Sequence, residues 1–202
     1  MNMKPLTMMV FTGLAALALG AAQADAAGRV KARGGHVNAD GGVTTGRAAA
    51  YRGSNGAKGY SHRGVTTDGA GNIQGGSRAA GVGPNGGSYR RGGTTTKNAD
   101  GSASHNSGIR TTNAKGTLDS SGNVVRNADG SYSGQRSTQA TGTNGGNYNS
   151  STQYANGTGT HATTATGANG TTYQGQTSWT KGQGVTHTGT CHDAAGNEIA
   201  CH

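Results

Sequence analysis

The amino-acid sequence predicts an all-β chain of short strands and tight turns, arranged either as a β-meander or as an irregular β-solenoid. Asn-Gly and Asp-Gly pairs recur along the chain, and the residues between them alternate with period two. No window carries an apolar stripe with the 3.6-residue period of a helix. A largely disordered chain is the alternative, because Gly, Thr, Ser and Asn make up more than half of the sequence after residue 26.

Residues 1–26 have the three-part layout of a secretory signal peptide. Lys4 precedes a mostly apolar run from Leu6 to Leu19, and the small-residue stretch that follows ends with Ala24-Asp25-Ala26. The apolar run is shorter than the roughly 20 residues of a membrane-spanning helix. Ala22-Gln23-Ala24 fits the small-x-small cleavage rule as well, so cleavage after Ala24 is the alternative to cleavage after Ala26. We therefore expect export with cleavage after Ala26, to the cell surface or the medium, with the periplasm as the alternative destination.

The remaining 176 residues hold too few large apolar side chains for a conventional core. They contain 8 Val, 3 Ile, 1 Leu, 7 Tyr and 1 Trp. Each such side chain stabilises a fold by about 1.5–3 kcal/mol when fully buried, whereas ordering the backbone alone costs about 1–2 kcal/mol per residue. Backbone pairing and stacking between neighbouring units must therefore supply the order that the chain has.

Three short motifs mark the chain reversals. The pattern G-x-N-G-x-x-Y begins at Gly83, Gly142 and Gly167, and Asn-Ala-Asp-Gly begins at Asn38, Asn98 and Asn127. A third motif, D-x-x-G-N, begins at Asp68, Asp119 and Asp193. Asn, Asp and Gly tolerate the positive φ that two-residue type I′ hairpins need at both central positions. We expect such turns to join strands of about five to seven residues, in units of about 15.

The D-x-x-G-N turns and the spaced tyrosines loosely resemble the YD-type repeats of secreted bacterial surface proteins. The resemblance covers three five-residue patches and identifies no specific family. It implies a Gly/Thr/Asn-rich surface repeat protein, and no functional residue is transferred from it.

Residues 27–136 form a basic Gly/Arg-rich repeat region, and most of the net charge of +9 lies in it. Guanidinium groups bind phosphate, sulfate and carboxylate as forked donors, and nearby tyrosines can stack on sugars or bases. We expect binding to anionic polysaccharide, lipopolysaccharide or extracellular DNA. Arg-Gly-Gly segments also occur in RNA-binding proteins, but an exported chain does not meet cellular RNA. A charge that serves only solubility is the competing interpretation. The candidate anion-binding residues are Arg33, Arg52, Arg63, Arg90 and Arg91.

Residues 137–190 form a nearly uncharged region rich in Thr, Asn, Gly and Tyr, and Lys181 is their only charged residue. Within this region, residues 137–180 contain no Pro and have a composition that suits self-association by edge pairing. The candidate self-association residues are Tyr148, Tyr154, Tyr173 and Trp179.

Residues 191–202 form a C-terminal hairpin that contains the two Cys of the chain, Cys191 and Cys201. Gly196 lies midway between them, so a reversal there places the two sulfurs opposite each other. An exported protein with two Cys favours a disulfide. A metal site made with the adjacent His192 and His202 is the alternative, although neighbouring residues of a strand point to opposite faces.

The sequence shows no catalytic motif. Carboxylates are too few and too far apart for paired acid–base chemistry, and no nucleophile, phosphate-binding or metalloprotease motif occurs. We expect no enzyme activity, no cofactor, no metal and no small-molecule substrate. The leading interpretation is a secreted structural or adhesive protein of the bacterial envelope or biofilm matrix. A disordered, basic, monomeric binding protein and a small exported metal-binding protein are the alternatives.

Overall fold

The structure is a computed structural model that describes residues 27–201. The predicted signal peptide, residues 1–26, and His202 lie outside the described residues. The described chain forms thirteen β-strands: β1 (Gly28–Val37), β2 (Val43–Arg52), β3 (Lys58–Thr67), β4 (Ile73–Val82), β5 (Ser88–Lys97), β6 (Ala103–Asn113), β7 (Gly116–Arg126), β8 (Tyr132–Gly142), β9 (Asn147–Ala155), β10 (Thr158–Thr166), β11 (Thr172–Thr180), β12 (Gly184–His192) and β13 (Glu198–Ile199).

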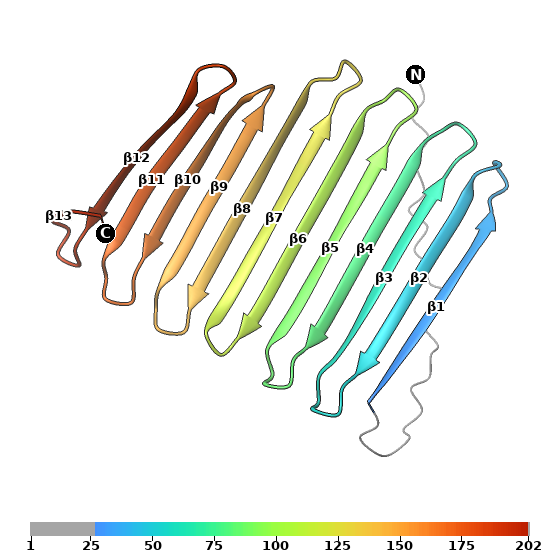
Figure 1. Cartoon of the computed structure of the whole chain (residues 1–202), viewed down its shortest axis with the longest axis horizontal. Coiled ribbons are helices and arrows are strands. Elements are labelled where there is room, and N and C mark those ends of the chain that lie inside the picture. The colour runs from blue at the N-terminus through green and yellow to red at the C-terminus, as the bar shows by residue number, and fades with distance from the viewer. Residues whose placement is uncertain (1–26, 202) are drawn as a thin grey trace.

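All thirteen strands lie in one antiparallel sheet in chain order, which confirms the predicted β-meander (Figure 1). Each strand pairs only with its neighbours in sequence, and the sheet is open. The boundary between the basic and the neutral region falls inside β8, so both regions belong to the same sheet. Among the described residues there is no helix of the length and hydropathy that crossing a membrane requires.

The strands are longer than the sequence predicted. Strands β1 to β12 have 9 to 11 residues each, not five to seven. The backbone ladder continues through the glycines inside them, for example through the Gly46↔Gly64 and Gly64↔Gly76 pairs. A ten-residue strand and a five-residue turn together give the 15-residue unit.

Nine connections share one five-residue turn, and the three sequence motifs are versions of it. In each turn the first residue donates its N–H to the carbonyl of the fifth, and the fourth residue, always Gly, donates to the carbonyl of the first. Only this Gly has positive φ, as at Gly41 (φ 80°) and Gly130 (φ 85°). This is a type I turn followed by a left-handed residue, so the predicted type I′ geometry is wrong for these nine turns. Asn156 and Gly157 alone have positive φ at both central positions of a two-residue turn.

One predicted turn is wrong altogether. The motif that begins at Asp119 lies inside β7, where Asp119 pairs with Arg110 on one side and Gln139 on the other. Its Gly122 and Asn123 continue the strand ladder instead of reversing the chain. The motif reverses the chain at Asp68 and Asp193, where the carboxylate accepts the N–H groups of the third and fifth turn residues.

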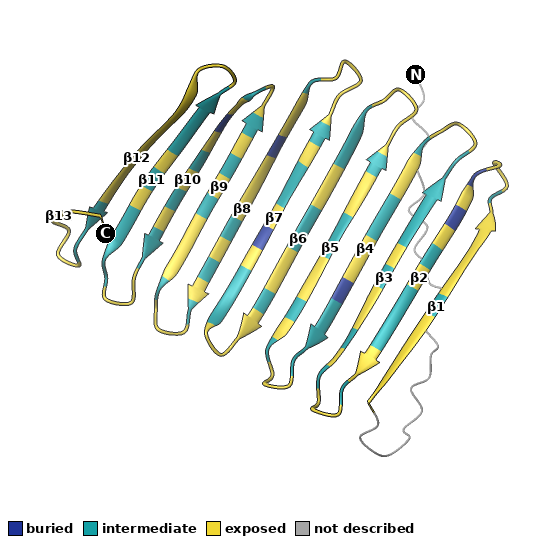
Figure 2. Cartoon of the chain, viewed as in Figure 1, coloured by how far each residue is buried: buried dark blue, intermediate teal, exposed yellow. Residues whose placement is uncertain are grey.

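The sheet is one layer thick and has almost no interior (Figure 2). Only Thr44, Ala79 and Ser120 among the non-glycine described residues are buried, and no side chain is fully buried. The accessible surface is 14444 Å², whereas a compact protein of 19.9 kDa exposes about 8,700 Å². The fold is therefore held by its backbone ladder and by contacts between side chains of adjacent strands.

Candidate anion-binding face

Register fixes which side chains share a face of this sheet, because directly paired residues of adjacent strands point to the same side. We call the side that carries Tyr51, Tyr89, Tyr148, Tyr173 and Trp179 the aromatic face, and the other side the opposite face. Tracing the pairs from β1 to β12 puts seven of the eight described aromatic residues on the aromatic face. Tyr60 alone lies on the opposite face.

The five arginines proposed from the sequence are divided between the two faces. Arg33, Arg63 and Arg91 lie on the aromatic face. Arg52 and Arg90 lie on the opposite face. The predicted set is therefore not one cluster, because neighbours in sequence such as Arg90 and Arg91 point to opposite sides of a strand.

Register also brings in a residue that the sequence analysis missed. Arg47 pairs directly with Arg33 of β1 and with Arg63 of β3. We call these three residues the arginine row. Their side chains are all exposed, and they follow one another at the strand spacing of about 4.8 Å along a line perpendicular to the strands.

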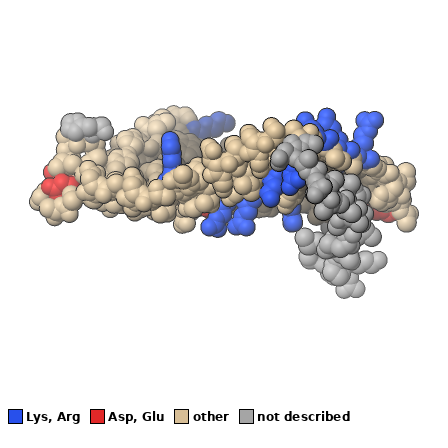
Figure 3. Space-filling model, turned by 90° about the horizontal axis from the view of Figure 1, so that it is seen from below, with Lys and Arg blue, Asp and Glu red and all other residues tan. Residues whose placement is uncertain are grey.

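The arginine row lies in the most basic part of the aromatic face. Lys31 and Arg29 extend it along β1, and no Asp or Glu of the described strands lies on this face, because Asp119 and Glu198 both lie on the opposite face. The aromatic face carries nine Lys and Arg residues in strands: Arg29, Lys31, Arg33, Arg47, Arg63, Arg91, Lys97, Arg126 and Arg136. Figure 3 shows Lys and Arg projecting from both faces, with one end of the sheet almost free of them.

The arginine row costs the isolated sheet some stability. Like charges directly opposite each other in neighbouring strands repel, by about 1 kcal/mol per pair at this spacing in water. In the described part of the chain the only ion pair joins Arg110 and Asp119, on the opposite face, at 4.0 Å. A bound anion would remove the repulsion within the row, so the row has the electrostatics of a polyanion site.

Two tyrosines lie beside this basic region. Tyr51 pairs with Arg29 of β1, and Tyr51 and Tyr89 interact by a hydrogen bond between their hydroxyls. Desolvation, followed by the hydrogen bond and charge interaction with Tyr89, raises the pKa of the Tyr51 phenol. Tyr51 therefore stays protonated at neutral pH and can donate a hydrogen bond or stack on a sugar or base.

The four residues proposed for self-association all lie on the aromatic face. Tyr148 and Tyr154 belong to β9, and Tyr173 and Trp179 belong to β11. The backbones of β9 and β11 are paired on both sides within the sheet. These strands therefore present only side chains to a partner, and self-association through residues 137–180 stays a prediction.

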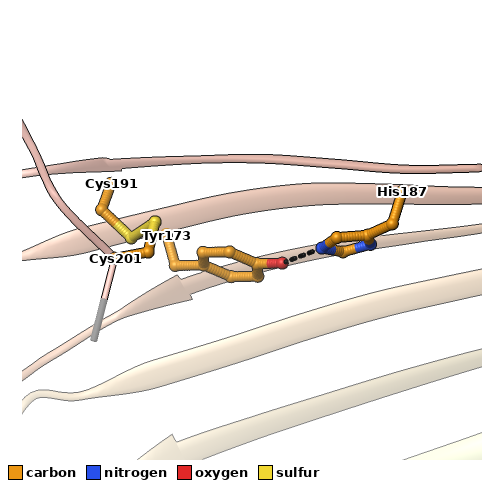
Figure 4. Close-up of a disulfide and its surroundings, with 4 residues drawn as sticks. All are labelled: Tyr173, His187, Cys191 and Cys201. Atoms are coloured by element: carbon orange, nitrogen blue, oxygen red, sulfur yellow. Dashed lines mark hydrogen bonds between the residues drawn. A yellow bond between two sulfur atoms is a disulfide. The ribbon is translucent and has the colours of Figure 1, made fainter.

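The C-terminal Cys pair forms the predicted disulfide. Cys191 and Cys201 are bonded, with their Cα atoms 5.4 Å apart, across a turn in which Gly196 has φ 90° (Figure 4). Neither sulfur is therefore available as a thiolate metal ligand. Nearby, the Tyr173 hydroxyl lies 3.4 Å from His187 Nε2. Within residues 27–201 no group of three or more metal-ligating side chains occurs.

No family model, curated protein or solved structure matches this chain.

Proposed function

We propose that this is an exported structural protein of the bacterial envelope or extracellular matrix, in which flat sheets self-associate and bind a linear anionic polymer. The observation that carries the proposal is the arginine row, with no acidic strand residue on the face around it. Acidic polysaccharide, lipopolysaccharide and extracellular DNA share the required chemistry, a chain of closely spaced negative charges.

The flatness of the site favours a polymer over a small ligand. Small-molecule sites are concave and bury most of their ligand, whereas the arginine row is exposed on a single-layer sheet. An extended polyanion can cross several strands and contact one guanidinium on each. Arg33, Arg47 and Arg63 then act as one site, although they are far apart in sequence.

The test compares two triple variants of equal charge. One replaces the arginine row (Arg33→Gln, Arg47→Gln, Arg63→Gln), and its matched control replaces three arginines of the opposite face (Arg52→Gln, Arg78→Gln, Arg90→Gln). Binding to double-stranded DNA and to polygalacturonate is measured over a range of salt concentrations. We expect the arginine-row variant to bind much more weakly and, on DNA, to lower the salt-dependence slope by about three.

The control variant should keep most of the affinity, because its arginines do not form a row. Equal losses in the two variants would show that net charge alone attracts the polymer. Salt-independent binding would reject an electrostatic site. The two polymers distinguish the sources, since a preference for one of them at equal salt identifies the class of anion.

A further inference from the structure

Among residues 27–201, no strand pairs with the outer side of β1 and only the short β13 pairs with the outer side of β12, so both outer edges of the sheet have open positions. At one edge, the backbone N–H of Asn38 donates a hydrogen bond to the carbonyl of Gly42. In an antiparallel pair every second residue bonds to the neighbouring strand, so the even-numbered residues of β1 bond to β2. The N–H and C=O groups of the odd-numbered residues Arg29 to Val37 therefore point outward. At the other edge, the Asp193-to-Asn197 bond sets the same pattern, and the odd-numbered residues of β12 point outward.

β13 covers only one end of the second edge. It pairs with β12 at Cys191 and His192 alone, and the disulfide fixes it there. The outward groups of Val185, His187 and Gly189 have no strand of the described chain beside them. Seven residues of β12, from 184 to 190, therefore present an open ladder.

The two edges have strand directions and side-chain faces that allow them to pair with each other. Strands β1 and β12 are separated by an even count of alternating strands, so they run in opposite directions. The outward residues of both edges also lie on the aromatic face, as Lys31 and His187 do. An antiparallel ladder between β12 of one copy and β1 of the next would therefore continue the sheet with its aromatic face unbroken.

Charge favours this pairing over pairing of two identical edges. The outward residues of β1 include Arg29, Lys31 and Arg33, so two β1 edges would place like charges opposite each other. Strand β12 has no Lys, Arg, Asp or Glu. The cationic edge therefore meets less repulsion on β12 than on a second β1.

We infer that β12 of one copy pairs antiparallel with β1 of another copy, and that repetition of this contact builds an open-ended ribbon one sheet thick. The contact joins two different edges, so it does not close on itself and continues from copy to copy. This inference deepens the self-association part of the proposed function. It does not depend on polymer binding.

The test uses two edge-blocking proline variants of the full chain, purified in the form that the host cell exports. Lys31→Pro removes an outward N–H from β1, and His187→Pro removes one from β12, while the bonds to β2 and β11 remain. Electron microscopy and sedimentation velocity measure assembly. We expect ribbons from the unmodified protein, monomers from each variant alone, and a 1:1 dimer when the two variants are mixed, because each retains one working edge.

A second set of variants avoids proline in case it unfolds an edge strand. Val185→Lys with His187→Lys makes the β12 edge cationic, and we expect it to lose ribbons through repulsion of β1. Adding Arg29→Glu with Lys31→Glu should restore them. Three results would each overturn the inference. The unmodified protein could stay monomeric, the mixture of the two proline variants could give no dimer, or the His187→Pro variant could dimerise alone through β1.

The arginine-row triple variant separates this inference from the polymer site. It should lose DNA binding and still form ribbons, because Arg47 and Arg63 lie on inner strands and Arg33→Gln keeps the β1 backbone donor. Ribbons that disappear together with DNA binding in this variant would show that the polymer, and not the edge ladder, joins the copies.

Discussion

At the scale of single residues, large aromatic rings lie across glycines of the adjacent strand. A Cβ built on Gly59 would lie 2.7 Å from Tyr51 Cε1, and one on Gly81 would lie 2.8 Å from Tyr89 Cε1. Tyr154 covers Gly134 in the same way, and Trp179 covers Gly159. The glycine has no side chain, so the ring can lie flat on the backbone of the adjacent strand. Each aromatic–glycine pair therefore supplies packing contacts in a sheet without a core.

This arrangement predicts that Gly159→Ala destabilises the sheet even though alanine suits strands better than glycine. Its Cβ would collide with the Trp179 indole, and we expect a loss of about 1–3 kcal/mol from overpacking. Urea unfolding monitored by fluorescence measures the change directly, because Trp179 is the only Trp of the chain.

The matched control for this substitution is Gly46→Ala. A Cβ there would meet only the Arg63 carbonyl, at 3.6 Å. We expect this variant to gain about 0.5–1 kcal/mol, because alanine loses less backbone entropy than glycine. A Gly159→Ala variant that is as stable as Gly46→Ala would contradict the role of the aromatic–glycine pairs.

Residue-level features were predictable from the sequence where they depend on local spacing. The Cys191–Cys201 disulfide follows from a turn at Gly196, and it is confirmed. The arginine row was not found, because it depends on the exact centre of each reversal. Once the first turn is known to place Val37 opposite Val43, Arg33 must face Arg47. The missing information was turn geometry, not composition.

At the scale of elements, the turns carry most of the acidic groups of the described chain. In the turn formed by residues 98–102, Asp100 accepts hydrogen bonds from the backbone and the hydroxyl of Ser102. Asp129 accepts the backbone N–H of Ser131. Hydrogen bonds of this kind lower the pKa of the carboxyls of Asp68, Asp100, Asp129 and Asp193.

These pKa shifts predict that the sheet loses stability in acid. A carboxyl whose pKa is lower in the folded state than its unfolded value of about 3.9 contributes its full stabilisation above that value. The contribution is lost as the pH falls through the folded pKa. We expect the melting temperature to drop between about pH 5 and about pH 2, which thermal unfolding followed by circular dichroism measures.

The control is the pair of substitutions Asp100→Asn and Asp129→Asn. Asn occupies the same turn position at Asn55, Asn144 and Asn169, where it accepts the same backbone hydrogen bond. The variant should therefore keep its stability at neutral pH and lose less of it in acid. An unchanged acid profile would mean that these turn carboxyls do not set the pH dependence.

The order of elements was predictable, whereas their lengths were not. Turn residues identify where the chain reverses, and the strand ladder between turns is set by how far pairing can continue. The strands continue through their glycines because the neighbouring strands on both sides supply hydrogen bonds. The motif at Asp119 shows that turn residues alone do not identify a reversal, since this motif forms part of a strand that is paired on both sides.

At the scale of the whole molecule, the sheet lacks the second layer that most antiparallel sheets pack against. Seven of the eight described aromatic residues lie on one face, yet no strand or turn of residues 27–201 covers that face. Folding therefore removes much less apolar surface from water than folding of a two-layer domain does. The thermodynamics of unfolding should reveal this difference.

We predict an unusually small heat-capacity change on unfolding. Globular proteins show about 12–15 cal/mol/K per residue, chiefly from newly exposed apolar surface. Because only Thr44, Ala79 and Ser120 are buried besides glycines in the described part of the chain, dispersed protein should fall well below that range in scanning calorimetry. A value inside the range would indicate that the faces are covered by stacked copies under the conditions of the measurement.

The weak interior also predicts that the melting temperature depends on protein concentration. Each edge contact between copies stabilises the folded state by mass action, by up to about 1.4 kcal/mol for every tenfold rise in concentration. That gain corresponds to a rise of several degrees for a small domain. His187→Pro should melt at a temperature independent of concentration, because it cannot extend from β12. If both proteins melted independently of concentration, the single layer would be stable by its internal ladder alone, and the outer edges would contribute nothing to it.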